Sequence, residues 1–307
     1  MTWLLLVEQM LNGAQFGVFL FLVSAGLTLV LGIMNVVNLA HGSLFMLGAY
    51  YAATFFGLTG SFLVALVIMV PLALISGIVI EVVALRTMYD RDHMDQVLAT
   101  FGLILFFNES VRLVWGPESQ PMPVPGFLDG SVEILPEAPY PVFRIVVILV
   151  GLAVGAGLYF MITRTKIGML IRAGASNRAM VGALGVNIRL LYTLVFGLGA
   201  ILAGLAGMMA GPIQSVEPGM GEDMLILAFV VIVIGGIGSI RGAVIASVLI
   251  GIVEVVGRSI LPFAMANFMG EDAAQTAGPA VASMLIYVLM AAVLFFKPAG
   301  LFPAQAG

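Results

Sequence analysis

Long apolar runs recur along almost the whole chain, and they constrain the fold more than any other feature. A membrane-spanning helix needs about 20 mostly apolar residues. Nine runs approach or exceed that length: Met10–Ile33, Leu39–Gly57, Phe62–Leu85, Val97–Trp115, Val142–Ile162, Leu190–Gly211, Met224–Gly238, Ala243–Leu261 and Pro279–Phe296. Because backbone polar groups in lipid must be satisfied internally, such runs form helices. The sequence predicts an all-α, polytopic transmembrane helix bundle of eight or nine spans.

The composition leaves no room for a separate soluble unit. Of the 307 residues, 62% are hydrophobic and 9% are charged, whereas a soluble domain is about half apolar and about a quarter charged. We therefore expect residues 1–307 to form a single transmembrane domain. The second and seventh runs are short or glycine-rich, and some spans are expected to be broken or re-entrant. The first run lacks the flanks of a signal peptide and is expected to be retained as a span.

Charge in the connecting segments predicts the orientation. Residues 116–141 carry four acids and no Lys or Arg, and their many prolines exclude a long helix, so an irregular, Pro-rich outer loop is expected. Arg86, Arg91, residues 164–189 and Lys297 supply basic segments, which should face the cytoplasm. The N-terminus then lies outside and the C-terminus inside. Nine crossings fit this pattern. With eight crossings, one run would enter the membrane and return to the same side, and one terminus would then lie on the opposite side.

The segment 164–189 carries basic residues, no acid and no run of spanning length. Its middle, 173–185, is made of small residues with a few apolar ones, which suggests a docking surface. Ser176 can cap a short helix that bears Met180, Val181 and Leu184, and Gly185 can end it. Such a helix could insert into a groove on a partner or lie on lipid headgroups, and these residues favour neither reading.

Polar and glycine-rich breaks separate two pairs of runs. We consider these residues as candidates for lining or gating a translocation pathway: Asn35, Asn38, His41, Gly42, Ser43, Gly235, Gly236, Gly238 and Ser239. Polar groups at membrane depth must face protein or a water-filled cavity. The alternative is that they satisfy the backbone of broken helices and that Gly42 allows close helix approach. The two breaks could reflect an internal repeat or common glycine-rich turns.

Several other chemistries are disfavoured. The absence of Cys excludes disulfides and thiolate metal sites. No phosphate-binding GxxxxGK loop and no chain of buried carboxylates occurs, so any ATPase must be another chain. His41 beside Ser43 lacks the partners of a hydrolase, and no basic tract suits nucleic acid. Glu109 with Arg112, Glu254 with Arg258, and Glu81 are interpreted as self-neutralised or snorkelling charges near helix ends, although a role along the pathway is the alternative.

Several blocks of the sequence resemble one family. GLTLVLGIMNVVNLAHGSLFMLGAY at 26–50, IRAGASNRAMVGALGVNI at 171–188 and VVIVIGGIGSIRGAVIASVLIG at 230–251 are similar to characteristic blocks of LivH-type permease subunits of bacterial branched-chain amino acid ABC transporters. NESVRLVWG at 108–116 and KPAGLF at 297–302 match the same family. The blocks occur in the same order over nearly the whole chain.

The resemblance implies a permease subunit that is not itself an enzyme and holds no cofactor. Its expected partners are a second, LivM-like permease, two ATPase subunits that bind ATP and Mg²⁺, a periplasmic substrate-binding protein and the lipid bilayer of the bacterial inner membrane, with no nucleic acid. The residues implied to couple to an ATPase are Ala173, Gly174, Ala175, Ser176, Asn177, Arg178, Ala179, Met180, Val181, Gly182, Ala183, Leu184 and Gly185. Many importers carry a Glu-Ala-Ala motif here, which this chain lacks. The alternatives are a stand-alone carrier or channel for a small polar solute, or a permease for urea or amides.

Overall fold

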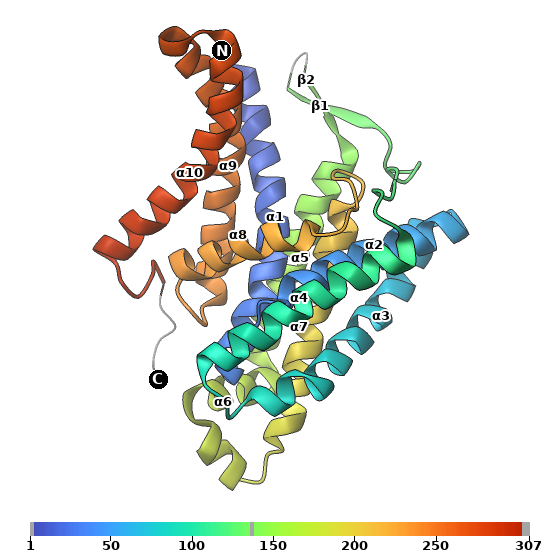
Figure 1. The fold of residues 1–307 in the computed structure, drawn as a ribbon, viewed down its shortest axis with the longest axis vertical. Coiled ribbons are helices and arrows are strands. Elements are labelled where there is room, and N and C mark those ends of the chain that lie inside the picture. Colours follow the sequence, from blue (N-terminus) through green and yellow to red (C-terminus); the bar gives the residue numbers. More distant parts are fainter. Residues whose placement is uncertain (1–2, 136–137, 303–307) are drawn as a thin grey trace.

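Helices make up most of the molecule (Figure 1). The computed structural model describes residues 3–135 and 138–302. The elements are α1 (Trp3–Met34), α2 (His41–Thr59), α3 (Phe62–Val83), the short 3₁₀ helix η1 (Leu85–Met88), α4 (His93–Trp115), β1 (Ser131–Leu135), β2 (Ala138–Pro141), α5 (Val142–Arg164), α6 (Lys166–Ala183), α7 (Ile188–Ala210), α8 (Met220–Gly235), α9 (Ile240–Met269) and α10 (Glu271–Phe296).

The expected apolar runs each correspond to one helix. Seven of the described helices are long and apolar enough to cross a membrane: α1, α3 continued by η1, α4, α5, α7, α9 and α10. The other two, α2 and α8, have 19 and 16 residues and are the runs predicted to be short or broken. The predicted all-α transmembrane bundle is confirmed, with seven candidate spans among the described residues.

The first helix forms the centre of the bundle. α1 packs against α9 and α7 and also contacts α8 and α5. From Gly17 to Val30 every residue of α1 is buried. A helix that is apolar on all sides is stable only when it is surrounded, and the neighbouring helices supply that environment.

Glycines allow two of the helix pairs to touch backbone to backbone. A Cβ atom on Gly48 of α2 would lie 2.2 Å from the Cα atom of Gly204 in α7. A Cβ atom on Gly42 would lie 2.2 Å from the carbonyl oxygen of Gly221 in α8. Both distances are far shorter than any real carbon contact, so these crossings require glycine, as is common in membrane bundles.

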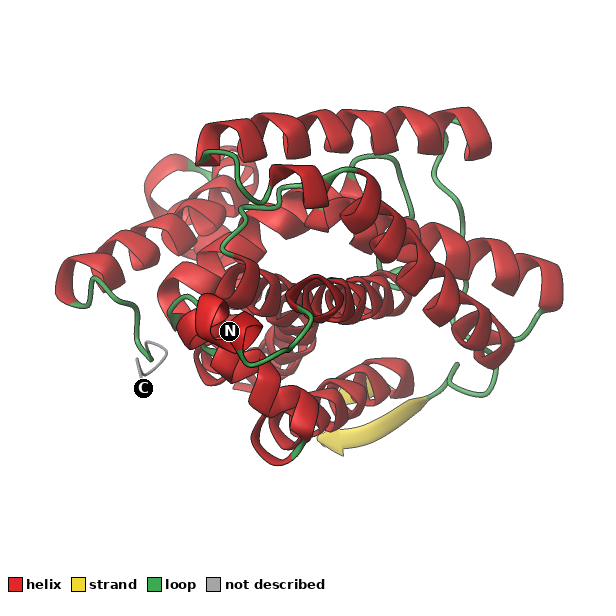
Figure 2. Ribbon diagram, turned by 90° about the horizontal axis from the view of Figure 1, so that it is seen from below, coloured by secondary structure: helices red, strands yellow, loops and turns green. Residues whose placement is uncertain are grey.

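The prediction that the Pro-rich segment 116–141 is irregular throughout is wrong. β1 and β2 form an antiparallel pair in which Val132 lies opposite Tyr140 and Glu133 opposite Pro139. Proline is tolerated because each strand of a two-stranded sheet is an edge strand. Residues 136–137, between the strands, lie outside the described part. Seen from below, the strands lie at the margin of the helical body (Figure 2).

The bundle has two distinct ends. At the hairpin end, Arg144 at the start of α5 donates a hydrogen bond to Asn12 of α1, next to β2. At the α6 end, the last turn of α1 contacts α6, where Ile33 lies beside Gly174. Figure 1 shows the hairpin and α6 at opposite ends of the molecule. The segments predicted to be outer and cytoplasmic are therefore separated by the length of α1.

The segment after α10 returns to the end of α8. The amide of Leu301 donates to the carbonyl of Ile234 at 2.8 Å, and the amide of Phe302 donates to that of Gly235 at 3.0 Å. These bonds satisfy two carbonyl groups that the last turn of α8 leaves open.

Candidate functional site

Residues 173–185, for which coupling to an ATPase was predicted and which are called the coupling segment below, lie in α6 and the connector that follows it. α6 is interrupted at Asn177, whose φ of −152° and ψ of 89° are not helical. The side-chain oxygen of Asn177 accepts a hydrogen bond from the amide of Met180 at 2.9 Å. The short helix after the break is therefore capped by Asn177, and the prediction that Ser176 is the cap is wrong by one residue. Ser176 instead belongs to the first part of α6, which the Thr165 side chain caps.

The predicted end of the short helix is confirmed. Gly185 has a φ of +87°, in the left-handed region that favours glycine. Its amide donates to the carbonyl of Gly182 at 3.0 Å, and the amide of Val186 donates to that of Val181 at 3.3 Å. This pair of bonds is the Schellman pattern of helix ends. The next helix begins within a few residues, where the Asn187 side chain caps α7.

The short helix presents apolar side chains outward. Met180 is 58% exposed and Leu184 is 76% exposed, while Val181 between them is buried and holds the helix against the bundle. Residues 175–180 are all exposed. Since Met180 and Leu184 are four positions apart, they lie on one face. The short helix therefore has an exposed, partly apolar face.

A cavity of about 420 Å³ lies between the coupling segment and the end of α1. Its walls come from Gly32, Ile33 and Asn35 on one side and from residues 174–179 on the other. Asn35 thus adjoins the coupling segment. The interruption at Asn177 lies in the wall of the same cavity, so the short helix has open space behind its first residues.

The first break, residues 35–40, folds the chain from α1 back into the bundle. Asn35 is exposed, has a φ of +52°, and its amide donates to the carbonyl of Leu31 at 3.1 Å. These are the features of a residue that ends a helix. The buried Asn38 side chain accepts a hydrogen bond from the amide of Ala40 at 3.0 Å. Both asparagines therefore serve the backbone of the break.

His41, Gly42 and Ser43 begin α2 inside the bundle, and all three are buried. The imidazole of His41 lies between α1 and α7, where it limits the space beside Gly26 and Gly199. Within the described residues, neither of its ring nitrogens nor the Nδ2 atom of Asn38 has a partner that meets full hydrogen-bond geometry, although the backbone of Val23 lies near the imidazole. Buried polar groups are usually paired. These atoms keep the break a candidate for the passage, but the buried hydroxyls of Thr28 and Tyr50 also lack partners in the described part of the chain.

The second break joins α8 to α9. Gly236 and Gly238 have φ values of +105° and +79°, and the hydroxyl of Ser239 caps α9 by accepting from the amide of Gly242 at 3.1 Å. Gly235 packs against the backbone of Gly242. Gly238 reaches the last turn of α1, where a Cβ on Gly32 would lie 3.4 Å from its Cα. Among the described residues, no hydrogen bond joins the two breaks.

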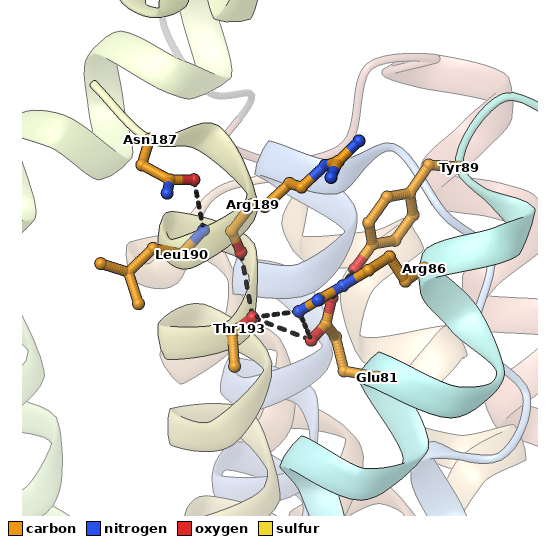
Figure 3. A network of polar contacts seen from close by, with 7 residues as sticks. All are labelled: Glu81, Arg86, Tyr89, Asn187, Arg189, Leu190 and Thr193. Atoms are coloured by element: carbon orange, nitrogen blue, oxygen red, sulfur yellow. Dashed lines mark hydrogen bonds and ion pairs between the residues drawn. The ribbon is translucent and has the colours of Figure 1, made fainter. Parts of the chain in front are cut away.

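A polar cluster joins α3 to α7 (Figure 3). Glu81 is neutralised by Arg86 near the end of α3, as predicted, but it is fully buried and does not snorkel. Its carboxylate accepts from Arg86 at 3.2 and 2.9 Å, from Thr193 at 2.8 Å and from the hydroxyl of Tyr89. Burial, together with the bond to Glu81, raises the pKa of Tyr89, so the phenol stays a donor. Arg86 and Tyr89 follow Glu81 closely, but nothing local identifies Thr193.

The other charged pairs form as their spacing predicts. Arg112 and Glu109 make an exposed ion pair at 2.9 Å, and Arg258 pairs with Glu254. In the described part of the chain, no group of three or more His, Asp or Glu is placed to hold a metal ion.

These features define a multi-pass membrane protein with an exposed helical segment at one end of its bundle. The model of the family described as the permease component of branched-chain amino acid transport systems matches residues 9–294. The chain belongs to this family. Its homologues are transport subunits and not enzymes.

Named relatives cover most of the chain. It is 28% identical to the high-affinity branched-chain amino acid transport system permease protein BraD of Pseudomonas aeruginosa, over 96% of this chain and 95% of that protein. It is 30% identical to the permease protein LivH of Escherichia coli strain K12, over 84% of this chain and 88% of the relative. LivH of Salmonella typhimurium is 29% identical over the same shares. No solved structure matches the chain.

Proposed function

We propose that this chain is the permease subunit of an ATP-driven importer for branched-chain or related hydrophobic amino acids. The observation that carries the proposal is the coupling segment, a short helix with exposed Met180 and Leu184 at one end of a membrane bundle. Membership of the family favours a partner over lipid for that surface. The energy would come from two ATPase subunits that bind ATP and Mg²⁺, because this chain carries no nucleotide-binding loop.

The remaining partners follow from the same assignment. A second, LivM-like permease would complete the passage, and a periplasmic binding protein would deliver the solute and supply most of the selectivity. Closure of the ATPases would move the coupling segment and switch the permease pair between outward-open and inward-open states, largely as rigid-body motion. The unpartnered atoms of Asn38 and His41 make the first break our candidate for the passage or its gate.

The distribution of charge supports an orientation in the bacterial inner membrane with the α6 end in the cytoplasm. Arg86 lies beside the start of α7, and the guanidinium of Arg241 lies 5.6 Å from the ring centroid of Tyr159 near the end of α5. The acidic segment 116–141 occupies the opposite end. By the positive-inside rule the N-terminus would be outside and the C-terminus inside.

Bulky substitution of Gly182 tests the docking surface. Only Ile188, at 3.5 Å, would be near a Cβ there, so the chain itself tolerates a side chain. We expect Gly182→Trp to leave the chain folded and to lower uptake at least tenfold while ATP hydrolysis persists. Gly126→Trp is the control, since it places the same side chain in open space on the segment 116–141. Normal uptake by Gly182→Trp would rule out docking through this face.

Reconstitution separates the proposal from its alternatives. The purified transporter in liposomes should transport leucine, isoleucine or valine only when ATP is present on the side of the membrane to which the ATPase subunits bind. Flux through this chain alone without ATP would favour a stand-alone carrier or channel. ATP-driven uptake of urea or amides, with no uptake of hydrophobic amino acids, would keep the mechanism and change the solute.

A further inference from the structure

The coupling segment is joined to α7 by a connector too short to absorb movement. The short helix ends at Ala183, and α7 begins at Ile188. Asn187 fixes the start of α7 by accepting a hydrogen bond from the amide of Leu190 at 3.1 Å. Displacement of the coupling segment must therefore reach the first turns of α7, where Thr193 lies.

Small residues bring α3 and α7 close together. A Cβ on Gly77 would lie 2.5 Å from that of Ala200, and one on Gly204 would lie 3.0 Å from that of Ala73. These contacts are apolar, and Leu74 of α3 packs against the backbone of Gly197 in α7. Among the described residues, Thr193 makes the only hydrogen bonds between α7 and either α3 or η1.

The polar cluster fixes this seam at the end nearest the coupling segment. Thr193 accepts from Arg86 at 3.0 Å, and its single hydroxyl hydrogen can be donated to Glu81 at 2.8 Å or to the carbonyl of Arg189 at 3.0 Å (Figure 3). The contact to Glu81 is the shorter of the two and is the one that joins α7 to α3. The side chain of Glu81 is fully buried, whereas that of Arg86 is 33% exposed. Hydrogen bonds to a buried carboxylate are strong and costly to leave unmade.

We propose that Glu81 is a positioning residue, which holds the end of α3 in register with the start of α7 so that movement of the coupling segment is passed to both helices. The inference rests on the proposed function, since it assigns the route by which movement enters the bundle. Without the cluster, the described contacts between α3 and α7 would be apolar alone, so their register would be held less firmly and ATP hydrolysis would move solute less efficiently.

Thr193→Val is the mildest test, because valine has the same shape and lacks only the hydroxyl. In the whole transporter we expect the amount of solute moved per ATP hydrolysed to fall roughly tenfold. The quantity of assembled transporter and its rate of ATP hydrolysis should stay near native values. Thr193→Ser, which keeps the hydroxyl, should restore the native ratio. Glu81→Gln should lower the ratio at least as much as Thr193→Val.

Thr163→Val is the matched control. Its hydroxyl donates only within α5, to the carbonyl of Tyr159 at 2.7 Å, and it also lies close to α6. We expect no change in the ratio of solute to ATP for this variant. An unchanged ratio in Thr193→Val and Glu81→Gln, or a loss of assembled transporter that accounts for all lost uptake, would overturn the positioning role.

Failure of the proposed function and failure of the role of Glu81 would give different results. If the native transporter shows no ATP-driven uptake, the proposed function fails before any variant is made, and the role of Glu81 fails with it. If the native transporter works and the variants keep its ratio of solute to ATP, only the role of Glu81 is lost.

Discussion

Backbone conformation and close contact explain several residues that look functional in the sequence. Asn35 is polar and lies between two apolar runs, yet its φ of +52° and its exposure match a residue that ends a helix. Asparagine is enriched at such positions because its short side chain tolerates the left-handed region. The structure thus favours a backbone role for Asn35, and leaves His41 and Asn38 as the stronger candidates for the passage.

Substitution of Asn35 distinguishes the two roles. Asn35→Gly should preserve stability and uptake, because glycine adopts this conformation readily. Asn35→Val should lower the free energy of unfolding by about 1–2 kcal/mol, the cost of a left-handed conformation for an L-residue. For each variant, thermal unfolding in detergent measures stability and an uptake assay in cells measures transport. Loss of uptake by a stable Asn35→Gly variant would show that the side chain itself acts in transport.

The contact between Gly42 and Gly221 gives a second prediction at this scale. Gly42→Ala must push α2 away from α8, because the new Cβ would lie 2.2 Å from a backbone oxygen. We expect a loss of about 1–3 kcal/mol in stability. Gly57→Ala in the same helix has open space and should gain up to about 1 kcal/mol. Equal melting temperatures for the two variants would contradict the close packing.

At the scale of elements, apolarity located the helices but not their ends. α9 continues to Met269 and α10 begins at Glu271, each several residues outside its apolar run and each passing through a proline, Pro262 or Pro279. Neighbouring helices in a membrane re-satisfy the backbone groups that proline frees, and a hydropathy pattern does not report this. The acidic residues Glu271 and Asp272 in the first turn of α10 interact favourably with the helix dipole, although in the sequence they suggest a connecting loop.

The break in α6 is an element whose position depends on a single cap. Asn177→Ala removes that cap and should destabilise residues 178–183 by about 1 kcal/mol, which would speed their amide exchange roughly fivefold. Asn177→Asp should keep the native exchange rate, since its carboxylate can still accept from Met180. Asn187→Ala, which removes the cap of α7, is the control and should leave residues 178–183 unchanged. Slow exchange in Asn177→Ala would mean that tertiary contacts hold the short helix.

At the scale of the whole molecule, the sequence predicted the class of fold and a short helix between residues 173 and 185, which is largely exposed, but not the contacts between distant elements. Glu81 and Thr193 are 112 positions apart, and local spacing suggested only a self-neutralised or snorkelling carboxylate near a helix end. Ser176 and Asn177 are both good caps, so the choice between them depends on where the first part of α6 stops packing. The strand pair in 131–141 was missed because three of its eleven residues are proline, which disfavours regular structure.

Thiol labelling tests the orientation directly, because the chain has no cysteine. Asp129→Cys and Ser176→Cys place one reactive group on each end, and both positions are exposed. In intact spheroplasts that produce this chain without the ATPase subunits, a membrane-impermeant maleimide should label Asp129→Cys at once and Ser176→Cys only after the membrane is permeabilised. The reverse pattern would invert the proposed orientation, and labelling of both without permeabilisation would contradict a spanning bundle.

The return of the chain to α8 has a consequence for biogenesis. Leu301 follows its partner Ile234 by 67 positions (301 − 234), as Phe302 follows Gly235. While the chain is being synthesised, the hydrogen-bond donors of the last α8 carbonyls therefore reach the membrane well after α8 itself. These two carbonyls lack their hydrogen-bond donors until then, so the α8–α9 turn is expected to be less ordered until the segment after α10 arrives. A chain terminated before Leu301 would keep all its candidate spans, but the α8–α9 turn would lack the two hydrogen bonds from Leu301 and Phe302.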